Sequence, residues 1–166
     1  MSDKVIRISD YTNLDAEFIK KCREAVIRLE GFVDRYVKAH ELDPIEQLLE
    51  LENIKRQHGA ELSYFMRFYS PVSSFRENHE FMSNERKGLK SRCIDELTKS
   101  GNNSTTAERL VYDSNTYKEG ISSIQDIKKF FIYVWETYQL HSQVISRSIH
   151  QSISTLQKEL ENLKRS

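Results

Sequence analysis

The hydrophobic positions in the last third of the chain recur every three or four residues, from about Ser114 to Lys164. This spacing places them along one side of a helix. The segment contains no proline and only one glycine, Gly120, so nothing in it is expected to end a helix. We therefore predict one very long helix, whose apolar side carries Ile124, Ile127, Phe131, Val134, Tyr138, Ile145, Ile149, Ile153, Leu156, Leu160 and Leu163.

The predicted helix is too long for a compact domain. A straight helix over 114–164 would extend roughly 75 Å at about 1.5 Å per residue, whereas a compact domain of 166 residues has a radius of gyration of about 15 Å. We therefore expect its far end to need a partner helix from a second copy of the chain, as in a short coiled coil. The alternative is that it packs on helices of its own chain. The predicted oligomer interface is Ile145, Ile149, Ile153, Leu156, Leu160 and Leu163.

Two further long helices are predicted in the first half of the chain. The first starts near 13–15 and ends at about His40. The segment Asp43-Pro44-Ile45-Glu46 begins the second, because it combines a capping carboxylate, a proline at the first helical position and a glutamate three residues after the cap. Pro71 is expected to end this helix, because the residue before a proline avoids helical backbone angles.

The middle of the chain predicts a third helix from Ser73 or Ser74 to Leu97, ended by a polar, mobile turn over 99–103 with Gly101 as its C-terminal glycine. The capping-box spacing over 105–108 predicts a short helix that ends near Tyr112, and Ser114 should cap the long helix. Residues 1–13, with the alternating pattern at 5–8, are expected to form an arm. The predicted fold is all-α, with helical hairpins in a single domain over residues 1–166.

Composition restricts the possible functions only weakly. Lysine plus arginine and aspartate plus glutamate both number 25, so net charge gives no argument for binding nucleic acid or membrane. Any electrostatic partner must bind a local patch. Cys22 and Cys93 lie far apart, with no histidine or cysteine at metal-ligand spacing, which indicates reduced thiols. Without a signal-like or spanning segment, we expect a cytoplasmic protein with no membrane partner, in an infected bacterial host cell.

The sequence shows no catalytic motif. It has no Gly-x-Ser-x-Gly turn, and its five glycines form no phosphate-binding loop. Its histidines are spread through different segments and suit ordinary helix faces better than a metal site. We therefore expect no enzyme activity, no cofactor and no metal. These histidines are His40, His58, His79, His141 and His150.

Charge is arranged unevenly along the chain. From Glu41 to Glu52 there are five acids and no base, whereas Ile54 to Lys99 holds nine bases and six acids. In the second segment the bases lie among aromatic residues, and that combination suits single-stranded nucleic acid, because cations neutralise phosphates while aromatic faces stack on bases. The alternative is that the aromatic residues are core and the cations a solvated rim. The candidate nucleic-acid-binding residues are Lys55, Arg56, Arg67, Tyr69, Arg76, Arg86, Lys87, Lys90 and Arg92.

Two short stretches carry a family resemblance. Arg67-Phe68-Tyr69-Ser70 looks like the basic Tyr-Tyr-Ser helix end of the UvsY-type recombination mediators of bacteriophages, and Val144-Ile145-Ser146-Arg147 is similar to the Ile-x-Ser-Arg stretch in the last helix of that family. Members of this family are small helical proteins that form rings and help load a recombinase onto single-stranded DNA. The resemblance implies that Lys55, Arg56 and Arg67 contact DNA and that the last helix joins subunits.

These observations lead to one expected function and one alternative. The expected function is that of an oligomeric single-stranded-DNA-binding accessory in phage-type recombination or replication, which loads a recombinase. Its partners would be single-stranded DNA, other copies of the chain, and a recombinase or single-strand-binding protein. The alternative is a helical adaptor or scaffolding protein that binds no nucleic acid and contacts other proteins through its long helix and the acidic stretch from Glu41 to Glu52.

Overall fold

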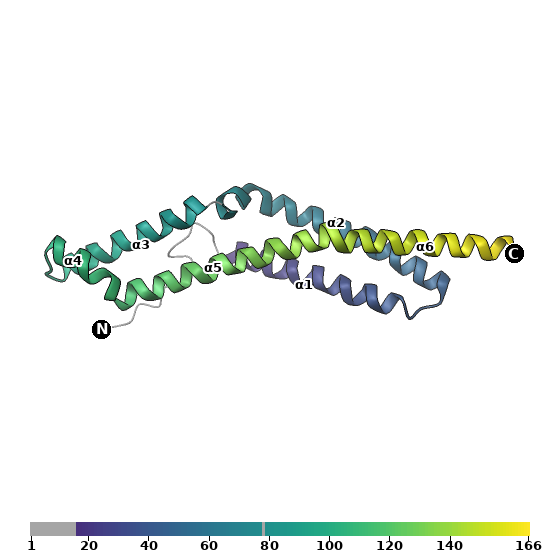
Figure 1. Ribbon diagram of the computed structural model, residues 1–166, viewed down its shortest axis with the longest axis horizontal. Coiled ribbons are helices and arrows are strands. Elements are labelled where there is room, and N and C mark those ends of the chain that lie inside the picture. The colour runs from purple at the N-terminus through teal and green to yellow at the C-terminus, as the bar shows by residue number, and fades with distance from the viewer. Residues whose placement is uncertain (1–15, 78) are drawn as a thin grey trace. The chain divides into compact units, whose positions relative to one another are not determined.

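The computed structural model describes residues 16–77 and 79–166, and side chains are described for 17–69 and 84–166. Its elements are helices with short connections (Figure 1). The described residues contain no strand, which confirms the all-α prediction. The arm predicted for residues 1–13 lies outside the described residues. The helices in chain order are α1 (Ala16–Ala39), α2 (Pro44–Glu77), α3 (His79–Lys99), α4 (Ser104–Leu110), α5 (Asn115–Leu140) and α6 (Ser146–Arg165).

The helix starts follow local capping chemistry. The side chain of Asp43 accepts hydrogen bonds from the backbone N–H groups of Ile45 and Glu46, both at 3.1 Å, as the sequence predicts for the start of α2. Ser114 likewise caps α5, because its hydroxyl accepts from the N–H of Tyr117 at 3.2 Å. The cap of α4 is Asn103, whose side chain accepts from Thr106 at 2.8 Å, so the predicted start at Thr105 is too late.

Two predicted boundaries around the second and third helices are wrong. Helix α2 continues through Pro71 to Glu77, and α3 begins at His79 and not at Ser73 or Ser74. A proline inside a helix removes one backbone hydrogen bond and crowds the preceding turn, which costs about 3 kcal/mol but does not forbid helical angles beyond it. The end of α3 is as predicted, since Gly101 has a φ of 101° that favours glycine.

The backbone is helical almost without interruption from Asn115 to Arg165, which confirms the predicted long C-terminal helix. Between α5 and α6 it contains a wider π-helical turn over His141–Ile145. One residue more than an α-helical turn is accommodated there. A short 3-10 turn, Val111–Asp113, precedes α5.

Internal contacts divide the chain into two compact units, and the division falls directly after Ile19, Pro71 and Ile132. The first unit contains described residues 16–19 and 72–132, and the second contains residues 20–71 and 133–166. The prediction of one domain over 1–166 stays a prediction.

In the first unit, α3 packs on the first half of α5 and on the short α4. Its main core is formed by Leu89, Cys93, Val111 and Ile124. Gly120 in α5 permits a close approach, because a Cβ atom added there would lie 2.5 Å from a methyl carbon of Leu89. A second cluster contains Ile127 and Phe131, with Phe18 packed against them.

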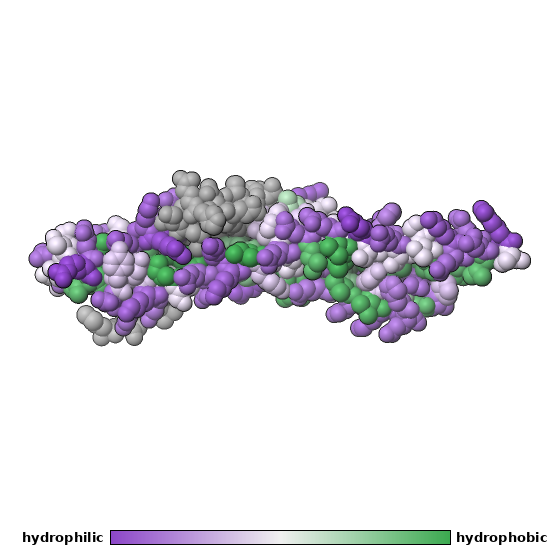
Figure 2. All heavy atoms as spheres, in the orientation of Figure 1, coloured by the Kyte–Doolittle hydropathy of each residue, from purple (hydrophilic) through white to green (hydrophobic). Residues whose placement is uncertain are grey.

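In the second unit, α1, α2 and α6 run beside one another (Figure 1). Polar side chains cover much of its surface in the view of Figure 2, with smaller apolar areas among them. Aromatic rings fill one part of the interior: Phe65 stacks on Tyr138 at 4.9 Å between ring centroids, and Tyr69 stacks on Trp135 at 5.6 Å. The aliphatic part of the core is formed by Ala39, Leu51, Ile54, Ile149, Ile153 and Leu156.

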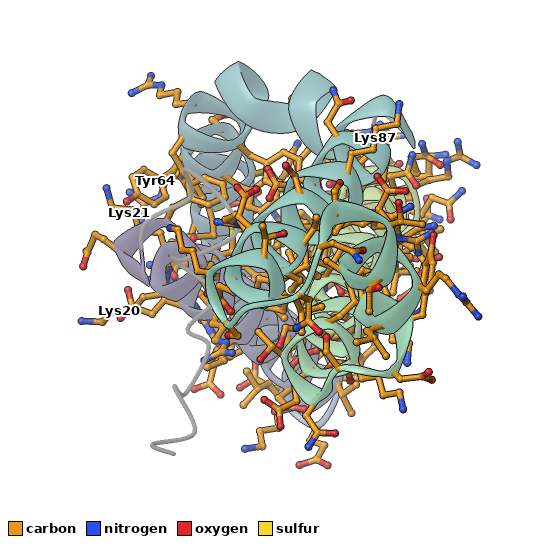
Figure 3. All side chains as sticks on the ribbon, turned by 90° about the vertical axis from the view of Figure 1, so that its left-hand side faces the viewer. Lys20, Lys21, Tyr64 and Lys87 are labelled. Carbon is orange, nitrogen blue, oxygen red and sulfur yellow. The ribbon has the colours of Figure 1, made fainter. Side chains whose placement is uncertain are left out.

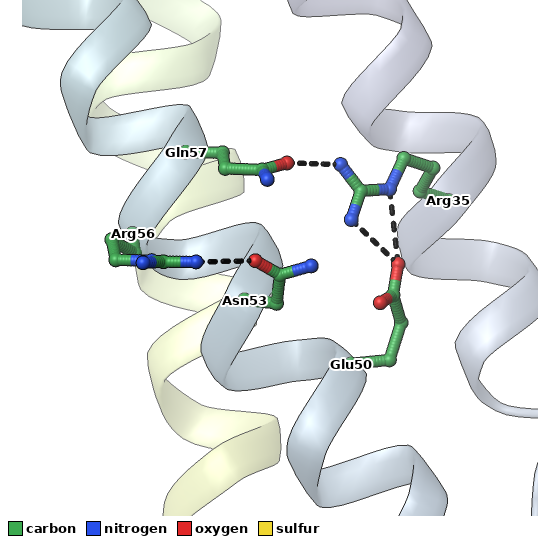
Figure 4. Close-up of polar contacts among 5 residues, drawn as sticks. All are labelled: Arg35, Glu50, Asn53, Arg56 and Gln57. Atoms are coloured by element: carbon green, nitrogen blue, oxygen red, sulfur yellow. Dashed lines mark hydrogen bonds and ion pairs between the residues drawn. The ribbon is translucent and has the colours of Figure 1, made fainter.

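A polar network joins α1 to α2 at the surface of the second unit (Figure 4). The guanidinium of Arg35 donates to Glu50 through Nε at 3.0 Å and Nη2 at 2.7 Å, and to the side-chain oxygen of Gln57 through Nη1. This fork sends two N–H groups to one oxygen of Glu50 and a third to Gln57, an arrangement that the single ammonium of lysine cannot reproduce. The network links one turn of α1 to two turns of α2.

Candidate nucleic-acid interface

Three of the predicted cations share one side of α3 in the first unit. Lys90 follows Lys87 by three residues and Arg86 by four, so its side chain emerges one turn along the helix from theirs. Arg86 and Lys87 are exposed and Lys90 is half-buried. Figure 3 shows Lys87 extending outward from its helix. Together they form a basic side of α3 that is open to a polyanion.

An aromatic ring lies against this basic side. The Nζ atom of Lys90 lies 4.9 Å from the ring centroid of Tyr112, within the range of a cation–π contact. The Tyr112 side chain is 51% exposed, and its ring meets that of Tyr117 edge-on at 5.5 Å between centroids. The hydrogen bond of Lys90 with the Tyr112 hydroxyl raises the pKa of the ammonium. An exposed tyrosine beside Lys90, on a helix that also carries Arg86 and Lys87, offers both groups that a single strand needs.

The fourth cation of this segment, Arg92, faces another side of α3, because it follows Lys90 by only two residues. It lies close enough to Glu85 to lower the pKa of that carboxyl group, although burial raises that pKa by more. We therefore separate Arg92 from the basic side of α3.

The remaining predicted cations belong to the second unit, apart from Arg76, whose side chain lies outside the described residues. Lys55, Arg56 and Arg67 are exposed on α2. The Nζ atom of Lys55 lies 3.5 Å from Nδ1 of His150, and Arg56 donates to the side chain of Asn53 at 2.9 Å (Figure 4). The predicted set is thus divided between the two units.

Tyr69 is not available for base stacking. Only 1% of its surface is exposed, and its ring is stacked between those of Phe65, at 4.7 Å, and Trp135, at 5.6 Å between centroids. Its place in the nucleic-acid-binding set is therefore wrong. Burial of the tyrosine ring is favoured over its exposure for base stacking, because stacking on other rings inside the core removes the whole side chain from water.

The assignment of the C-terminal apolar residues to an interface between copies is also corrected. Ile149, Ile153 and Leu156 are buried against α1 and α2 of the same chain, and Ile145 and Leu160 pack at the edge of that cluster. Of the six residues, Leu163 alone is largely exposed, at 68%. The alternative of packing within one chain therefore holds for this stripe. Self-association stays a prediction, without this stripe as its cause.

The sequence analysis missed a buried pair of histidines in the second unit. Nε2 of His58 lies 2.9 Å from Nδ1 of His141, and the two side chains are 2% and 1% exposed. Burial, and then the charge of His141, lower the pKa of His58 to about 4, and burial also lowers the pKa of His141. Both rings are therefore neutral at pH 7, and the N–H group of one ring donates a hydrogen bond to the unprotonated nitrogen of the other.

A signal for this pair is present in the sequence. His58 lies four residues from both Ile54 and Leu62, on the apolar side of α2. A histidine at such a position points into the core and needs a polar partner there. The partner, His141, occupies the first position of the π-helical turn.

Other kinds of site find no support among the described residues. No group of three or more histidine, cysteine, aspartate or glutamate side chains among them could hold a metal ion. A search of the same residues for a helix with the length and apolar character of a membrane span found none. Both cysteines are buried, and neither forms a disulfide.

Comparisons of the chain with protein-family models, curated proteins and solved structures found no match. Support for a nucleic-acid interface at the basic side of α3 and the adjoining Tyr112 therefore comes from their geometry alone.

Proposed function

We propose that the protein binds single-stranded DNA through the basic side of α3 and Tyr112, as an accessory in phage-type recombination or replication. The main support for the proposal is that the side chain of Tyr112 is exposed and that the Nζ atom of Lys90 lies 4.9 Å from the centroid of its ring. Cations attract the strand wherever its phosphates lie, and an exposed ring stacks on a base of any sequence. The site therefore suits binding without base specificity.

The resemblance to the UvsY-type mediators adds a role to this proposed activity. A protein that holds a single strand without base specificity can present it to a recombinase and load that enzyme. Lys55 and Arg67, exposed cations of α2 in the second unit, would provide a separate contact with the strand. Association of several copies would make binding along the strand cooperative.

Fluorescence anisotropy with a labelled oligonucleotide at several salt concentrations tests the proposal. Log affinity should fall with log salt by about 0.7 per phosphate neutralised. Replacing Arg86, Lys87 and Lys90 together by serine should weaken binding at least tenfold and make the slope shallower by about 2. The matched control replaces Lys158 and Lys164, exposed cations of α6, by serine and should bind as the parent does.

The aromatic contribution is tested separately from charge. Replacing Tyr112 by leucine should weaken binding roughly five- to hundredfold, because stacking of one base contributes about 1–3 kcal/mol, whereas Tyr112→Phe should keep most of the affinity. A salt-independent or absent interaction with DNA would favour the alternative, a helical adaptor or scaffolding protein. Measuring the mass in solution in the same samples tests self-association.

A further inference from the structure

Helix α2 has a second apolar side near its start, in addition to the one buried in the core. Leu48, Leu51 and Ile54 pack in the cluster with α1 and α6. Ile45 and Leu49, one helical turn apart, are 65% and 63% exposed. Leu42, in the connection before α2, is 41% exposed. We call these three exposed residues, Leu42, Ile45 and Leu49, the α2 apolar strip. An amphipathic helix of a monomer needs only one apolar side, so the strip requires an explanation.

The strip borders a hollow in the surface. An open groove of about 770 Å³ lies along these first turns of α2. Its wall combines the apolar side chains of Leu42 and Leu49 with polar groups from the next turns of the helix. The residues that line it are Leu42, Glu46, Leu49, Glu50, Glu52, Asn53 and Arg56.

The groove has an excess of negative charge. Its lining contains three acids, Glu46, Glu50 and Glu52, and one cation, Arg56. Among the described residues, Glu50 has an ion-pair partner, Arg35, and no ion pair is formed by Glu46 or Glu52. Glu52 accepts a hydrogen bond from the neutral Gln157 at 3.4 Å. A side-chain hydrogen bond with Asp43, and after it the charge repulsion of Asp43, raise the pKa of Glu46. A cation placed in the groove would relieve this repulsion.

We propose that the α2 apolar strip is a docking surface for a basic amphipathic helix of another protein. Leucine-type side chains of that helix would cover Ile45 and Leu49, and its lysine or arginine side chains would pair with Glu46 and Glu52. This is helix-in-groove recognition, with anchors three, four and seven residues apart. The negative charge of the groove repels nucleic acid. The surface lies in the second unit, whereas the basic side of α3 lies in the first, so this proposal does not depend on DNA binding.

A synthetic peptide provides the test. The probe is a fluorescein-labelled peptide of about 18 residues, roughly five helical turns, with leucines at i, i+3, i+4 and i+7 and lysines elsewhere. Anisotropy with the full chain should give a dissociation constant in the micromolar range. A peptide with the same residues in an order without an apolar side, and one with glutamate in place of lysine, should bind at least tenfold more weakly. Equal binding of all three peptides, or of none, would overturn the proposal.

Variants of the protein locate the binding. The double change Ile45→Gln and Leu49→Gln should weaken peptide binding at least tenfold, and Glu52→Gln should weaken it several-fold at low salt. The matched control is Ile27→Gln, because Ile27 on α1 is 67% exposed, as Ile45 is 65%. Unchanged circular dichroism and unfolding midpoints establish that the variants fold. Binding that survives the Ile45/Leu49 change would contradict the proposal.

A second copy of the chain is the competing occupant. Sedimentation of the parent protein and of the Ile45/Leu49 variant at micromolar concentrations separates the two. If the parent forms a dimer that this change dissolves, the strip is an interface between copies and the proposal is wrong. The DNA titration is read independently, because its variants lie in the first unit.

Discussion

His58 donates to or accepts from His141 across the core of the second unit, with 2.9 Å between Nε2 of the former and Nδ1 of the latter. The ring of Phe32 on α1 meets His58 edge-on at 5.5 Å, so the pair is enclosed by three helices. Glu30 is the charged group that most favours a proton on His141, although burial outweighs it. Two neutral imidazoles thus satisfy each other where a charge would be costly.

This pair should make the second unit sensitive to acid. Above pH 6.5 His58 is neutral in both the folded and the unfolded chain and has no effect on the balance between them. Below pH 6.5 the unfolded chain takes up a proton that the folded chain refuses until about pH 4, so stability falls through this range. The shift corresponds to at most about 3 kcal/mol from His58. Urea unfolding followed by circular dichroism between pH 7 and pH 4 measures the effect.

A double variant and a control accompany this measurement. Replacing His58 and His141 together by leucine should remove most of the fall in stability between pH 6.5 and pH 4, because these are the two buried histidines among the residues whose side chains are described. His150→Gln, at an exposed position of α6, should leave the pH dependence as it is. A pH profile shared by the parent and the double variant would show that other groups control acid unfolding.

Gly120 and Gly59 should respond in opposite ways to alanine. At Gly120 an added Cβ would lie 2.5 Å from Cδ2 and 2.7 Å from Cδ1 of the buried Leu89, whereas at Gly59 in α2 nothing lies within 4 Å. We expect Gly59→Ala to stabilise the protein by about 0.5–1 kcal/mol through helix propensity. Gly120→Ala should destabilise it by about 1 kcal/mol, since overpacking exceeds that gain. Thermal unfolding compares the two.

A smaller neighbour should rescue the glycine variant. Leu89→Val in the Gly120→Ala background shortens the side chain that meets the new methyl group, so the two changes together should cost less than the sum of each alone. If Gly120→Ala stabilises as much as Gly59→Ala does, the close approach of α3 and α5 is not tight.

Tyr69 is expected to matter for stability and not for DNA. Tyr69→Leu should destabilise the second unit by about 2 kcal/mol, because the replacement leaves space among the stacked rings of Phe65 and Trp135. Trp135 is the single tryptophan of the chain, so its fluorescence should report the change directly. The control Tyr64→Leu, at a side chain that is 44% exposed, should cost less than about 1 kcal/mol. Loss of DNA affinity in a folded Tyr69→Leu protein would contradict the burial argument.

The ion pair of Arg35 should be sensitive even to a conservative change. Arg35→Lys keeps the charge but loses the fork that reaches Glu50 and Gln57 together, and we expect a cost of about 1 kcal/mol in urea unfolding. Lys20→Gln removes an exposed pair with Glu24 at 3.9 Å and should have an effect below about 0.5 kcal/mol. Equal costs for the two variants would show that the fork contributes nothing special.

Local signals in the sequence predicted the fold well. Asp43 and Ser114 begin their helices as expected, because a cap depends on a few neighbouring residues. Pro71 misled the prediction, because the cost of proline is finite and a helix can continue beyond it. The three-to-four-residue spacing of Ile149 and Ile153 predicted a buried stripe, but spacing does not say which helices cover it.

The candidate site was predicted only in part, for a similar reason. Arg86, Lys87 and Lys90 were found from charge, whereas Tyr112 was missed because it lies 22 positions after Lys90 and only the fold brings them together. Tyr69 was misplaced because a sequence does not separate aromatic residues of the core from those of the surface. Tertiary packing decides both cases.

The wide turn at His141–Ile145 has a consequence for changes in chain length. The turn holds one residue more than an α-helical turn, so deleting an exposed residue from it, such as Gln143, would restore an ordinary turn and keep the faces of α5 and α6 in their present relation. Deleting one residue from the first turns of α6 would instead rotate the rest of that helix by about 100° and carry Ile153 and Leu156 away from α1 and α2. A single-codon deletion should therefore be tolerated in the wide turn and should prevent the second unit from assembling when it lies in α6.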